Sequence, residues 1–448
     1  MSRSSDPRDQ LQKILRAALA AVDARAAVSK ELAVEASGLS VCGYKLSGSA
    51  KLIVVAIGKA AAPMAAGVAA LVPEHIRTGL VVTKDGHCEG HDLSLFEVIE
   101  AGHPVPDARG EAAATRILDL VASADPEDLL LVLLSGGASA LASLPPKGIS
   151  CEELAVTNRL LLESGADIGE LNAVRKHLSQ ISGGRLAMSA AASQIAVLAV
   201  SDVLGDRLDV IGSGPCAPDP SRFQDALEVL ERRGLTQRVP ARVLRYLNSG
   251  RDGEEPESPK PGERAFARVR HRIVASNADA RHAAAAAATA LGARAVSLGG
   301  CIHDEAARVG RRIAALSAAV VCVDPVCLIA GGESVVEVRG KGLGGRNQEL
   351  ALAAAIEFDG SVVQGAVLLA VGTDGSDGST AAAGAWADVE TVERGRRCAV
   401  DAHRALADND SHGFFRAVSD TITTGPTGTN VMDLVLVWVP AQDDLAAR

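Results

Sequence analysis

The stretch LLLVLLSGGASAL, residues 129–141, joins an apolar run to a glycine turn and an alanine-rich segment. An apolar run that stops at a glycine turn is typical of a buried strand, and the residues after the turn favour a helix. The same plan recurs from KLIVVAI at 51–57, QIAVLAV at 194–200, VVEVR at 335–339 and AVLLAV at 366–371. Strand, turn and helix in alternation predict βαβ units, hence an α/β fold with mainly parallel sheets.

The length of the chain, 448 residues, exceeds what one hydrophobic core usually holds, so we expect two domains. Residues 248–264, NSGRDGEEPESPKPGER, are rich in proline, glycine and charge, which predicts a linker or exposed loop. The predicted domains are a Rossmann-like α/β domain over 1–252 and a smaller α/β domain over 265–448. A helical pattern from Asp9 to Ala36 predicts a surface helix at the start of the first domain.

The overall charge excludes several classes of partner. A net charge of −10 and the lack of a basic run argue against nucleic-acid binding. No uninterrupted run of eighteen apolar residues and no signal-peptide core are present, so we expect a cytoplasmic protein without a membrane span. The eight cysteines show no zinc-binding spacing, which fits a reducing compartment.

Lys59 is the first candidate for chemistry. It follows the strand KLIVVAI through a single residue, Gly58, and precedes an alanine-rich helix. Gly58 itself is a predicted contact of the substrate or nucleotide. An ammonium there would lie beside a helix N-terminus, whose free N–H groups already favour an anion. A lysine that only covers the surface is the alternative. The GxxxxGK[ST] spacing of a phosphate-binding loop is missing, so a nucleotide would have to be held in another way.

The turn SGGAS, residues 135–139, is the second candidate. Gly136 and Gly137 let the backbone approach a ligand closely, and Ser135 and Ser139 offer hydroxyl donors, which favours a phosphate or carboxylate cradle over a purely structural turn. LNAVRKHLSQISGG, 171–184, predicts a helix in which Arg175 either reaches the ligand or is solvated.

Two further turns follow predicted strands. Asp202 comes directly after QIAVLAV and is a candidate for Mg²⁺ binding or for accepting a hydroxyl proton, although a helix cap is the commoner use. Gly214, in the rigid turn GSGP, brings backbone donors with it. Asn277, in SNADA after another strand, is a candidate for ligand contact.

The segment GGESVVEVRGKGLGGRNQE, 331–349, admits two interpretations. Its glycines satisfy GxGxxG between a strand and a helix, which alone would indicate a dinucleotide site. The acid that would bind the ribose about twenty residues later is not found at a second strand end. Arg346 at the glycine-lined helix start is better suited to a carboxylate or phosphoryl group, with Glu333 and Asn347 as neighbouring contacts, and an interdomain salt bridge is the alternative.

GTDGSDG, 372–378, places Asp374 and Asp377 three residues apart on a glycine-rich loop after a strand. Two carboxylates on such a loop are typical of a hard-cation site, and Mg²⁺ held by one or two carboxylates plus phosphates is usual in phosphoryl transfer. The sequence therefore predicts a magnesium site at these two residues.

In these segments the chain resembles the class II glycerate 2-kinases, whose C-terminal half is called the MOFRL domain. The segments that carry the resemblance are AIGKAA, SGGASAL, LNAVRKHLSQISGGRLA, SDVLGD with IGSGP, SNADA, GGESVVEVRGKGLGGRNQELAL and GTDGSDGSTAAAGA, in this order over roughly residues 50 to 430. The resemblance implies ATP-dependent, Mg²⁺-assisted phosphorylation of D-glycerate at its 2-hydroxyl. It also implies a site between two α/β domains that Lys59 and Arg346 line.

We therefore expect glycerate and ATP as partners, no nucleic acid and no membrane, and we leave room for a homodimer. Lys59, Arg346 and Asp202 are the predicted catalytic residues, with Asp202 orienting or deprotonating the 2-hydroxyl. A nicotinamide-dependent hydroxypyruvate reductase is the chief rival, because the glycine pattern admits it. A non-catalytic sugar-acid sensor is a third hypothesis, but the sequence offers it no output module.

Overall fold

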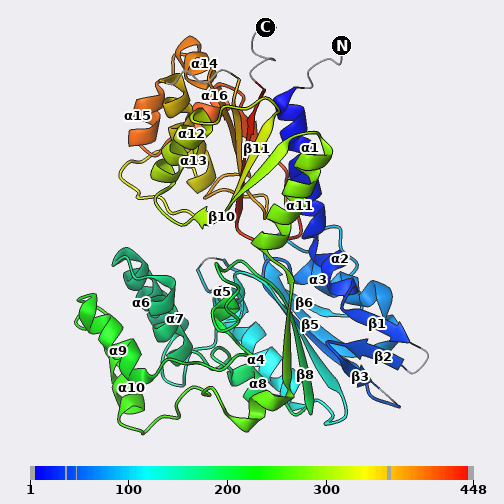
Figure 1. Cartoon of the computed structure of the whole chain (residues 1–448). Coiled ribbons are helices and arrows are strands. Elements are labelled where there is room, and N and C mark those ends of the chain that lie inside the picture. The colour runs from blue at the N-terminus through cyan, green and yellow to red at the C-terminus, as the bar shows by residue number, and fades with distance from the viewer. Residues whose placement is uncertain (1–5, 36–37, 47, 104, 361–364, 442–448) are drawn as a thin grey trace. The chain divides into compact units, whose positions relative to one another are not determined.

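The computed structural model describes residues 6–35, 38–46, 48–103, 105–360 and 365–441 (Figure 1). The chain forms two compact units. One, here the N-terminal unit, is Ala24–Val274, and the other, the C-terminal unit, combines Met1–Asp23 with Ala275–Arg448. Each unit has its own six-stranded sheet, and each is described by itself.

The sheet of the N-terminal unit has the order β6-β5-β4-β7-β8-β9. Its pairs β6·β5, β5·β4, β4·β7 and β7·β8 are all parallel, which confirms the predicted α/β class and parallel sheet here. Strands β4 and β7 are buried at every residue, because helices cover both faces of the sheet. The chain adds β5 and β6 on one side of β4, then β7 and β8 on the other, so the strand order reverses between β4 and β7. The six strands are β4 (Leu52–Ile57), β5 (Ile76–Lys84), β6 (Glu97–Ala101), β7 (Leu129–Leu134), β8 (Gln194–Val200) and β9 (Val269–Ala275).

Helices on both faces of this sheet supply its core. Ile53, Val55 and Ile57 of β4 share one cluster with Ile117 and Val121 of α4, while α3 contacts β4, β5 and β7. A second cluster joins α6, α7, α9 and α10, and β1–β3 form a small antiparallel sheet. The remaining elements of the unit are α2 (Ala24–Ser29), β1 (Leu32–Glu35), β2 (Gly38–Val41), β3 (Tyr44–Leu46), α3 (Ala61–Leu71), α4 (Ala108–Ala122), α5 (Ala138–Leu141), α6 (Cys151–Glu163), α7 (Ile168–His177), α8 (Arg185–Ser189), α9 (Phe223–Arg232) and α10 (Ala241–Arg251), with short 3-10 turns at Pro73–His75, Ile211–Ser213 and Arg264–Arg268.

The sheet of the C-terminal unit is mixed, with the order β10-β11-β15-β12-β13-β14. The pair β10·β11 is parallel, whereas the last strand, β15, enters between β11 and β12 and runs antiparallel to both. The expectation of a mainly parallel sheet is therefore wrong in this unit, because the chain end returns through the middle of the sheet. The strands are β10 (Arg294–Ile302), β11 (Val326–Gly332), β12 (Val367–Gly372), β13 (Gly384–Asp388), β14 (Thr421–Ile422) and β15 (Asp433–Val439).

Helices α12 and α13 pack on this sheet, and residues Leu350–Ala355 of α13 are all buried. The strand predicted at 335–339 is not formed. Those residues belong to a loop, and the strand before the glycine segment is β11, at 326–332. The helices of the unit are α1 (Pro7–Ala21), α11 (Asn277–Ala290), α12 (Ala306–Ala318), α13 (Arg346–Asp359), α14 (Thr391–Arg397), α15 (Ala402–Ala407) and α16 (Ser411–Ala417).

The predicted helix from Asp9 to Ala36 divides into α1 and α2, and its last part is wrong, because Leu32–Glu35 form strand β1; Ala36 itself lies outside the described residues. Helix α1 contacts α11 of the C-terminal unit (Figure 1). Arg8 fixes it there with ion pairs of 2.7 Å to Asp388 and to Asp420. Helix α1 therefore folds with the C-terminal unit and not with the first predicted domain.

The boundary between the units also differs from the predicted linker over 248–264. These residues belong to the N-terminal unit, which continues through β9 to Val274. Ser258 is buried, and its hydroxyl donates a 2.8 Å hydrogen bond to Asp219. The predicted linker is therefore wrong, whereas the exposed-loop alternative holds for most of 251–264, which the buried Ser258 anchors.

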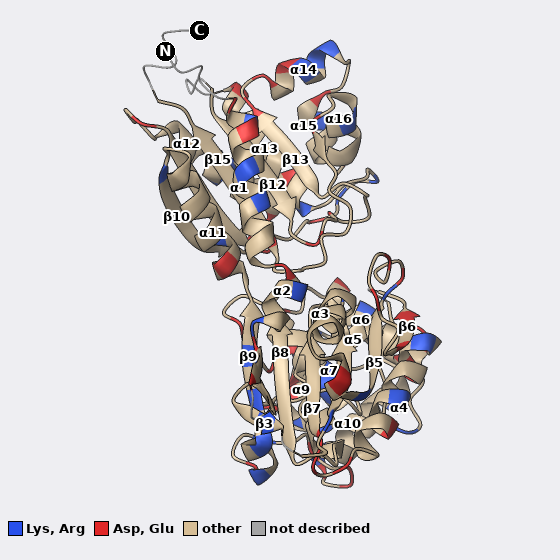
Figure 2. Ribbon diagram, turned by 90° about the vertical axis from the view of Figure 1, so that its right-hand side faces the viewer, with Lys and Arg blue, Asp and Glu red and all other residues tan. Residues whose placement is uncertain are grey.

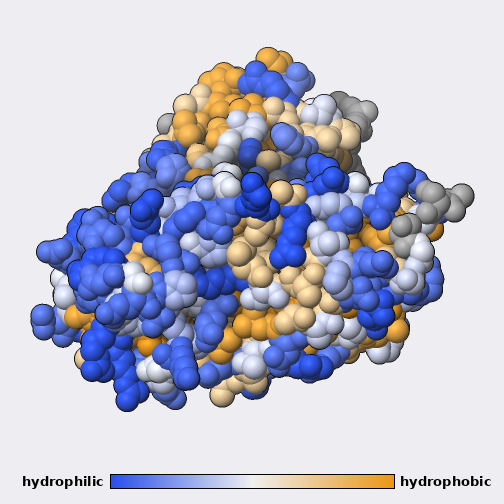
Figure 3. Space-filling view, turned by 90° about the horizontal axis from the view of Figure 1, so that it is seen from below, coloured by the Kyte–Doolittle hydropathy of each residue, from blue (hydrophilic) through white to orange (hydrophobic). Residues whose placement is uncertain are grey.

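The described surface carries both signs of charge. Lys and Arg residues alternate with Asp and Glu along the ribbon (Figure 2), and hydrophilic residues cover much of the face in Figure 3, with apolar ones in small groups. Among the residues that the structure describes, no helix is both long and apolar enough to cross a membrane.

Candidate functional site

The strand order of the N-terminal sheet reverses between β4 and β7, and we call the carboxyl ends of these two strands the switch point. Open α/β sheets hold their ligands at such a point. The two turns that follow these strands are bonded to each other. The N–H of Lys59 donates to the carbonyl of Gly136 at 2.9 Å, and the N–H of Ala60 donates to Oγ of Ser135 at 3.0 Å. The predicted motifs around Lys59 and SGGAS therefore form one structure.

Gly58 makes this close approach of the two turns feasible. Its φ is +129°, and a Cβ there would lie 2.2 Å from Oγ of Ser135 and 2.5 Å from its carbonyl oxygen. A side chain would therefore push the two turns apart. The absence of a side chain at Gly58 therefore lets the two turns meet and fixes the position of Lys59, and a contact of Gly58 with ligand stays a prediction.

Lys59 is half-buried at this switch point. A Cβ placed on Gly137 would lie 3.5 Å from Cγ of Lys59 and 2.9 Å from Cδ2 of His103. The carbonyl of Lys59 is also 3.0 Å from Nδ1 of His87. The sequence did not single out either histidine, because each lies in a loop after another strand and no spacing links it to Lys59.

The predicted donors of the SGGAS turn separate into two groups. Ser135 is fully buried and its oxygen accepts from Ala60, so it fixes the turn and does not face a ligand, contrary to its predicted role. Gly136 is buried as well, and its carbonyl holds Lys59. Gly137 and Ser139 are partly exposed and line a cavity.

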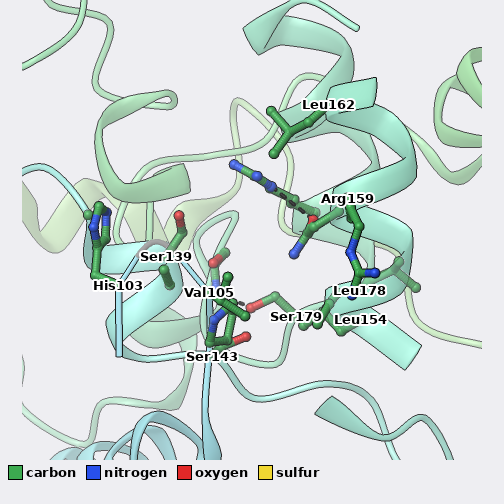
Figure 4. Close-up of a pocket in the computed structure, with 16 residues that line it drawn as sticks. His103, Val105, Ser139, Ser143, Leu154, Arg159, Leu162, Leu178 and Ser179 are labelled. Atoms are coloured by element: carbon green, nitrogen blue, oxygen red, sulfur yellow. Dashed lines mark hydrogen bonds between the residues drawn. The ribbon is translucent and has the colours of Figure 1, made fainter. Parts of the chain in front are cut away.

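That cavity has a volume of about 260 Å³ and lies between the SGGAS turn and helices α6 and α7 (Figure 4). Arg175, a predicted ligand contact on α7, lines it, and its Nε donates to Oδ1 of Asn158 at 3.0 Å. Arg159, on α6, is a second guanidinium at the cavity that the sequence did not reveal. Burial lowers the pKa of Arg175, which means that its protein surroundings do not compensate its charge.

Asp202 and Gly214 lie in the segment that follows β8 in the same unit. Asp202 is half-buried and follows the carboxyl end of β8, the neighbour of β7 in the sheet. Gly214 is buried, and its carbonyl accepts from the N–H of Gly184 at 2.8 Å. Gly214 therefore closes a structural turn, which differs from its predicted contact with ligand.

Arg346 begins α13 in the C-terminal unit, and two carboxylates hold its guanidinium. Nε and Nη2 lie 2.6 and 2.9 Å from the oxygens of Asp433, and Nη1 lies 2.8 Å from Glu333. Burial opposes the charge of Arg346, but Asp433 and then Glu333 outweigh burial and hold its pKa above the usual value. Glu333 is thus a partner of Arg346, and Asp433 is a central residue that sequence reasoning missed.

Asp377 anchors the start of α13. Its two oxygens accept from the backbone N–H groups of Asn347 and Gln348, each at 2.9 Å, and from both side-chain amides at 3.3 and 3.0 Å. Burial raises its pKa, although these four donors favour the charged form. Because its oxygens are engaged, Asp377 is a helix cap in the structure and not the predicted metal ligand.

Asp374 remains a candidate for a cation. It is half-buried, and its Oδ1 accepts from the N–H and the hydroxyl of Ser376, both at 2.9 Å. Within the described ranges, no group of three or more His, Cys, Asp or Glu side chains has the arrangement of a metal site. Protein ligands alone therefore do not form a closed site here.

Asn277 and Asn347 both hydrogen-bond within the protein, but the buried Oδ1 of Asn347 has no hydrogen-bond partner among the described residues. The amide of Asn277 donates to the carbonyls of Val431 and Asp433 at 2.9 and 3.0 Å, and its oxygen accepts from Arg281. The amide of Asn347 donates to Asp433 at 2.9 Å. Both asparagines fix the edge of the sheet around Asp433. For Asn277, whose amide and oxygen are both engaged, this replaces the predicted ligand contact, whereas the ligand contact of Asn347 stays a prediction.

The glycines of the GxGxxG pattern contact protein backbone. A Cβ on Gly340 would lie 2.2 Å from the carbonyl oxygen of Asp408, and one on Gly342 would lie 2.5 Å from Cα of Asp410. The N–H of Gly342 donates to Asp408 at 2.8 Å. These glycines therefore let the loop dock on residues 408–410, which explains the pattern without a dinucleotide.

Two family models match the chain, a domain of unknown function (DUF4147) over residues 10–248 and the MOFRL family over residues 326–433. A relative from Thermotoga maritima named D-glycerate 2-kinase is 42% identical over 86% of this chain and 90% of its own length. The chain belongs to the class II glycerate 2-kinase (MOFRL) family. A crystal structure of glycerate kinase from the same organism has a TM-score of 0.81 at 39% identity, covering 96% of this chain and 99% of that one.

The DUF4147 match of this glycerate 2-kinase family member contains the switch-point turns, and the MOFRL match contains Arg346, Asp377 and Asp433. A relative from Agrobacterium vitis, 38% identical over 96% of this chain and 94% of its own length, is provisionally named a hydroxypyruvate reductase. The glycine loop, which would be the structural basis for that activity, is filled by protein backbone in the structure.

Proposed function

We propose that the chain is a glycerate 2-kinase, which transfers the γ-phosphoryl group of ATP to the 2-hydroxyl of D-glycerate and releases 2-phosphoglycerate and ADP. The observation that carries the proposal is the position of Lys59. It lies at the switch point of a parallel sheet, in a turn bonded to the glycine turn after β7. A single cation held there is suited to a transferring phosphoryl group.

Phosphoryl transfer requires positioning and neutralisation of charge more than a strong base. In this proposal the ammonium of Lys59 binds the moving phosphoryl group, and Asp202, at the end of β8, orients the 2-hydroxyl and accepts its proton. Arg346, the cation at the start of α13, stays a proposed catalytic residue. A phosphate would have to replace the contact of Arg346 with Glu333, whose side chain is 48% exposed.

Mg²⁺, when bound with ATP, would reduce the negative charge of the phosphates, and Asp374 is the residue that would hold it. The residues present fit an ion held mostly by phosphates. Asp374 is half-buried and could supply one carboxylate ligand, whereas both carboxylate oxygens of Asp377 are already engaged by α13. Asp374 is therefore the residue that we propose for the ion. The cytoplasmic location and a homodimer stay predictions.

Two assays on the purified full-length chain distinguish the kinase from the reductase. With D-glycerate, ATP and Mg²⁺ we expect release of ADP that depends on glycerate, measured directly by chromatography. With hydroxypyruvate and NADH or NADPH, and without ATP, we expect no loss of absorbance at about 340 nm, the band of the reduced nicotinamide. If the chain consumed the reduced nicotinamide and released no ADP in the first assay, it would be a hydroxypyruvate reductase and the kinase proposal would be wrong.

A further inference from the structure

The cavity between the SGGAS turn and helices α6 and α7 carries positive charge without an acidic neighbour. Sixteen residues line it, and none of them is Asp or Glu, whereas Arg159 and Arg175 are both among them. Among the described residues, no carboxylate forms an ion pair with either arginine, and the side-chain partner of Arg175 is the neutral amide of Asn158. An anion is the ligand that would compensate these two guanidinium groups.

Hydroxyl groups on the wall of the cavity also favour an anion or another hydrogen-bond acceptor. Oγ of Ser179 accepts from the backbone N–H groups of Ile181 and Ser182, at 3.2 and 3.0 Å. A hydroxyl oxygen can accept two hydrogen bonds and donate one. Because Ser179 already accepts two, it can only donate to a ligand. Ser139 and Ser143 also line the cavity (Figure 4). A ligand that accepts hydrogen bonds therefore fits this wall.

The size and the apolar residues of the cavity limit what can enter. Its volume of about 260 Å³ is below the 300–1,000 Å³ usual for drug-sized ligands. Leu154 and Leu178 are buried on its wall, and Leu162, 58% exposed, lies at its edge. A short anion with a small carbon skeleton fits these walls better than a whole nucleotide.

One end of the cavity is the switch-point turn itself. Gly137 and Ser139 line the cavity, and a Cβ on Gly137 would be 3.5 Å from Cγ of Lys59. Figure 4 shows His103 and Ser139 on the side opposite Arg159. A small anion held by the arginines would thus extend its other end toward Lys59.

Resting on the proposed function, we infer that this cavity binds the carboxylate of the hydroxy-acid substrate, with Arg175 as its main ligand and Arg159 at its edge. The comparison with Arg346 supports this assignment, because Arg346 is already neutralised by Asp433 and Glu333, whereas Arg175 is not. The substrate class is therefore short 2-hydroxycarboxylates, with the carboxylate at Arg175 and the hydroxyl toward Lys59.

The test replaces Arg175 by methionine, which keeps an unbranched apolar stem similar to that of arginine and removes the charged guanidinium group. In the Arg175→Met variant we expect the KM for D-glycerate and its calorimetric Kd, measured without nucleotide, to rise at least about tenfold. The KM for ATP should stay within about twofold, because the cavity holds no part of the nucleotide. Arg159→Met, at an exposed position that should not affect folding, should give a smaller rise of the same kind. Arg116→Met is the control, since Arg116 pairs with Glu97 on the surface and does not line the cavity.

Each outcome decides between the alternatives. A loss of ATP affinity with unchanged glycerate affinity would assign the cavity to the nucleotide and overturn the inference. Unchanged affinities in both Arg175→Met and Arg159→Met would also overturn it. A wild-type chain that binds D-glycerate through Arg175 without releasing ADP would support the cavity and contradict the kinase. A wild-type kinase that Arg175→Met and Arg159→Met leave intact would contradict the cavity alone.

Discussion

Arg346 and Asp433 are 87 positions apart in the chain, yet Nε and Nη2 of the arginine lie 2.6 and 2.9 Å from the two carboxylate oxygens. Asp433 is fully buried at the start of β15, whereas the Arg346 side chain is 31% exposed. Asn347 donates to the same carboxylate. The start of α13 therefore depends on a strand from the end of the chain.

Replacing Asp433 by asparagine should destabilise the C-terminal unit. Removing one partner of a buried pair costs about 3 to 5 kcal/mol, and we expect about 2 kcal/mol here because solvent reaches Arg346. The thermal unfolding midpoint measures the effect. Asp359→Asn, which breaks an exposed pair with Arg396 in the same unit, should change stability by less than about 0.5 kcal/mol. Equal effects of the two variants would contradict the structural role of Asp433.

Lys59→Ala should abolish most of the activity without unfolding the chain. Loss of one preorganised donor to a charged transition state lowers kcat by about 10² to 10³. Lys51→Ala is a matched control, because Lys51 precedes the same strand at its opposite end and donates to the carbonyl of Glu74. Its rate of ADP release should stay within about threefold of the wild type. A similar rate for Lys59→Ala would remove Lys59 from the mechanism.

Gly58→Ala should separate the two switch-point turns, because the new Cβ would meet Ser135 at 2.2 Å. We expect the free energy of unfolding to fall by at least about 2 kcal/mol, and the activity to fall as well because Lys59 is displaced. Gly86→Ala tests the backbone effect alone, since Gly86 also has a positive φ, +79°, but nothing within 4 Å of its Cβ position. That control should cost about 1 kcal/mol. Urea unfolding of both variants measures the difference, and equal losses would contradict the close contact.

Acid should weaken the N-terminal unit through Glu257. Burial opposes the charge of Glu257, but the hydrogen bond with His177, 2.8 Å long, lowers its pKa from the usual 4.5 to about 2. A lowered pKa in the folded state gives stability that is present above pH 4.5 and lost as the pH falls toward 2. In thermal unfolding, the wild type should exceed Glu257→Gln at neutral pH, and the gap should close below pH 4.5. A constant gap would show that Glu257 does not supply this stability.

The N-terminal unit could be predicted well because its determinants are local. LLLVLL and LIVVAI are apolar at every residue, which is what a strand covered on both faces requires, and the glycine turns after them mark their ends. The position of Lys59 followed from the end of β4. The contact between its turn and Ser135 did not, because the pairing of β4 with β7 joins residues far apart in the sequence.

The C-terminal unit could be predicted less well because its organisation is non-local. β15 enters between β11 and β12 in the antiparallel sense, and no residue of DLVLVWV reveals which strands it joins. Asp433 carried no signal, since its importance comes from that insertion. Asp377 had the composition of a cation site, but the helix it caps lies earlier in the chain, and only the fold brings the two together.

The position of the phosphate on the product tests the central claim most directly. The chain is incubated with D-glycerate, ATP and Mg²⁺, and the product is offered to enolase, which acts directly on 2-phosphoglycerate and not on the 3-phosphate. We predict immediate formation of phosphoenolpyruvate, at a rate that follows ADP release and is lost in Lys59→Ala. ADP release that gives phosphoenolpyruvate only after a phosphoglycerate mutase is added would contradict transfer to the 2-hydroxyl.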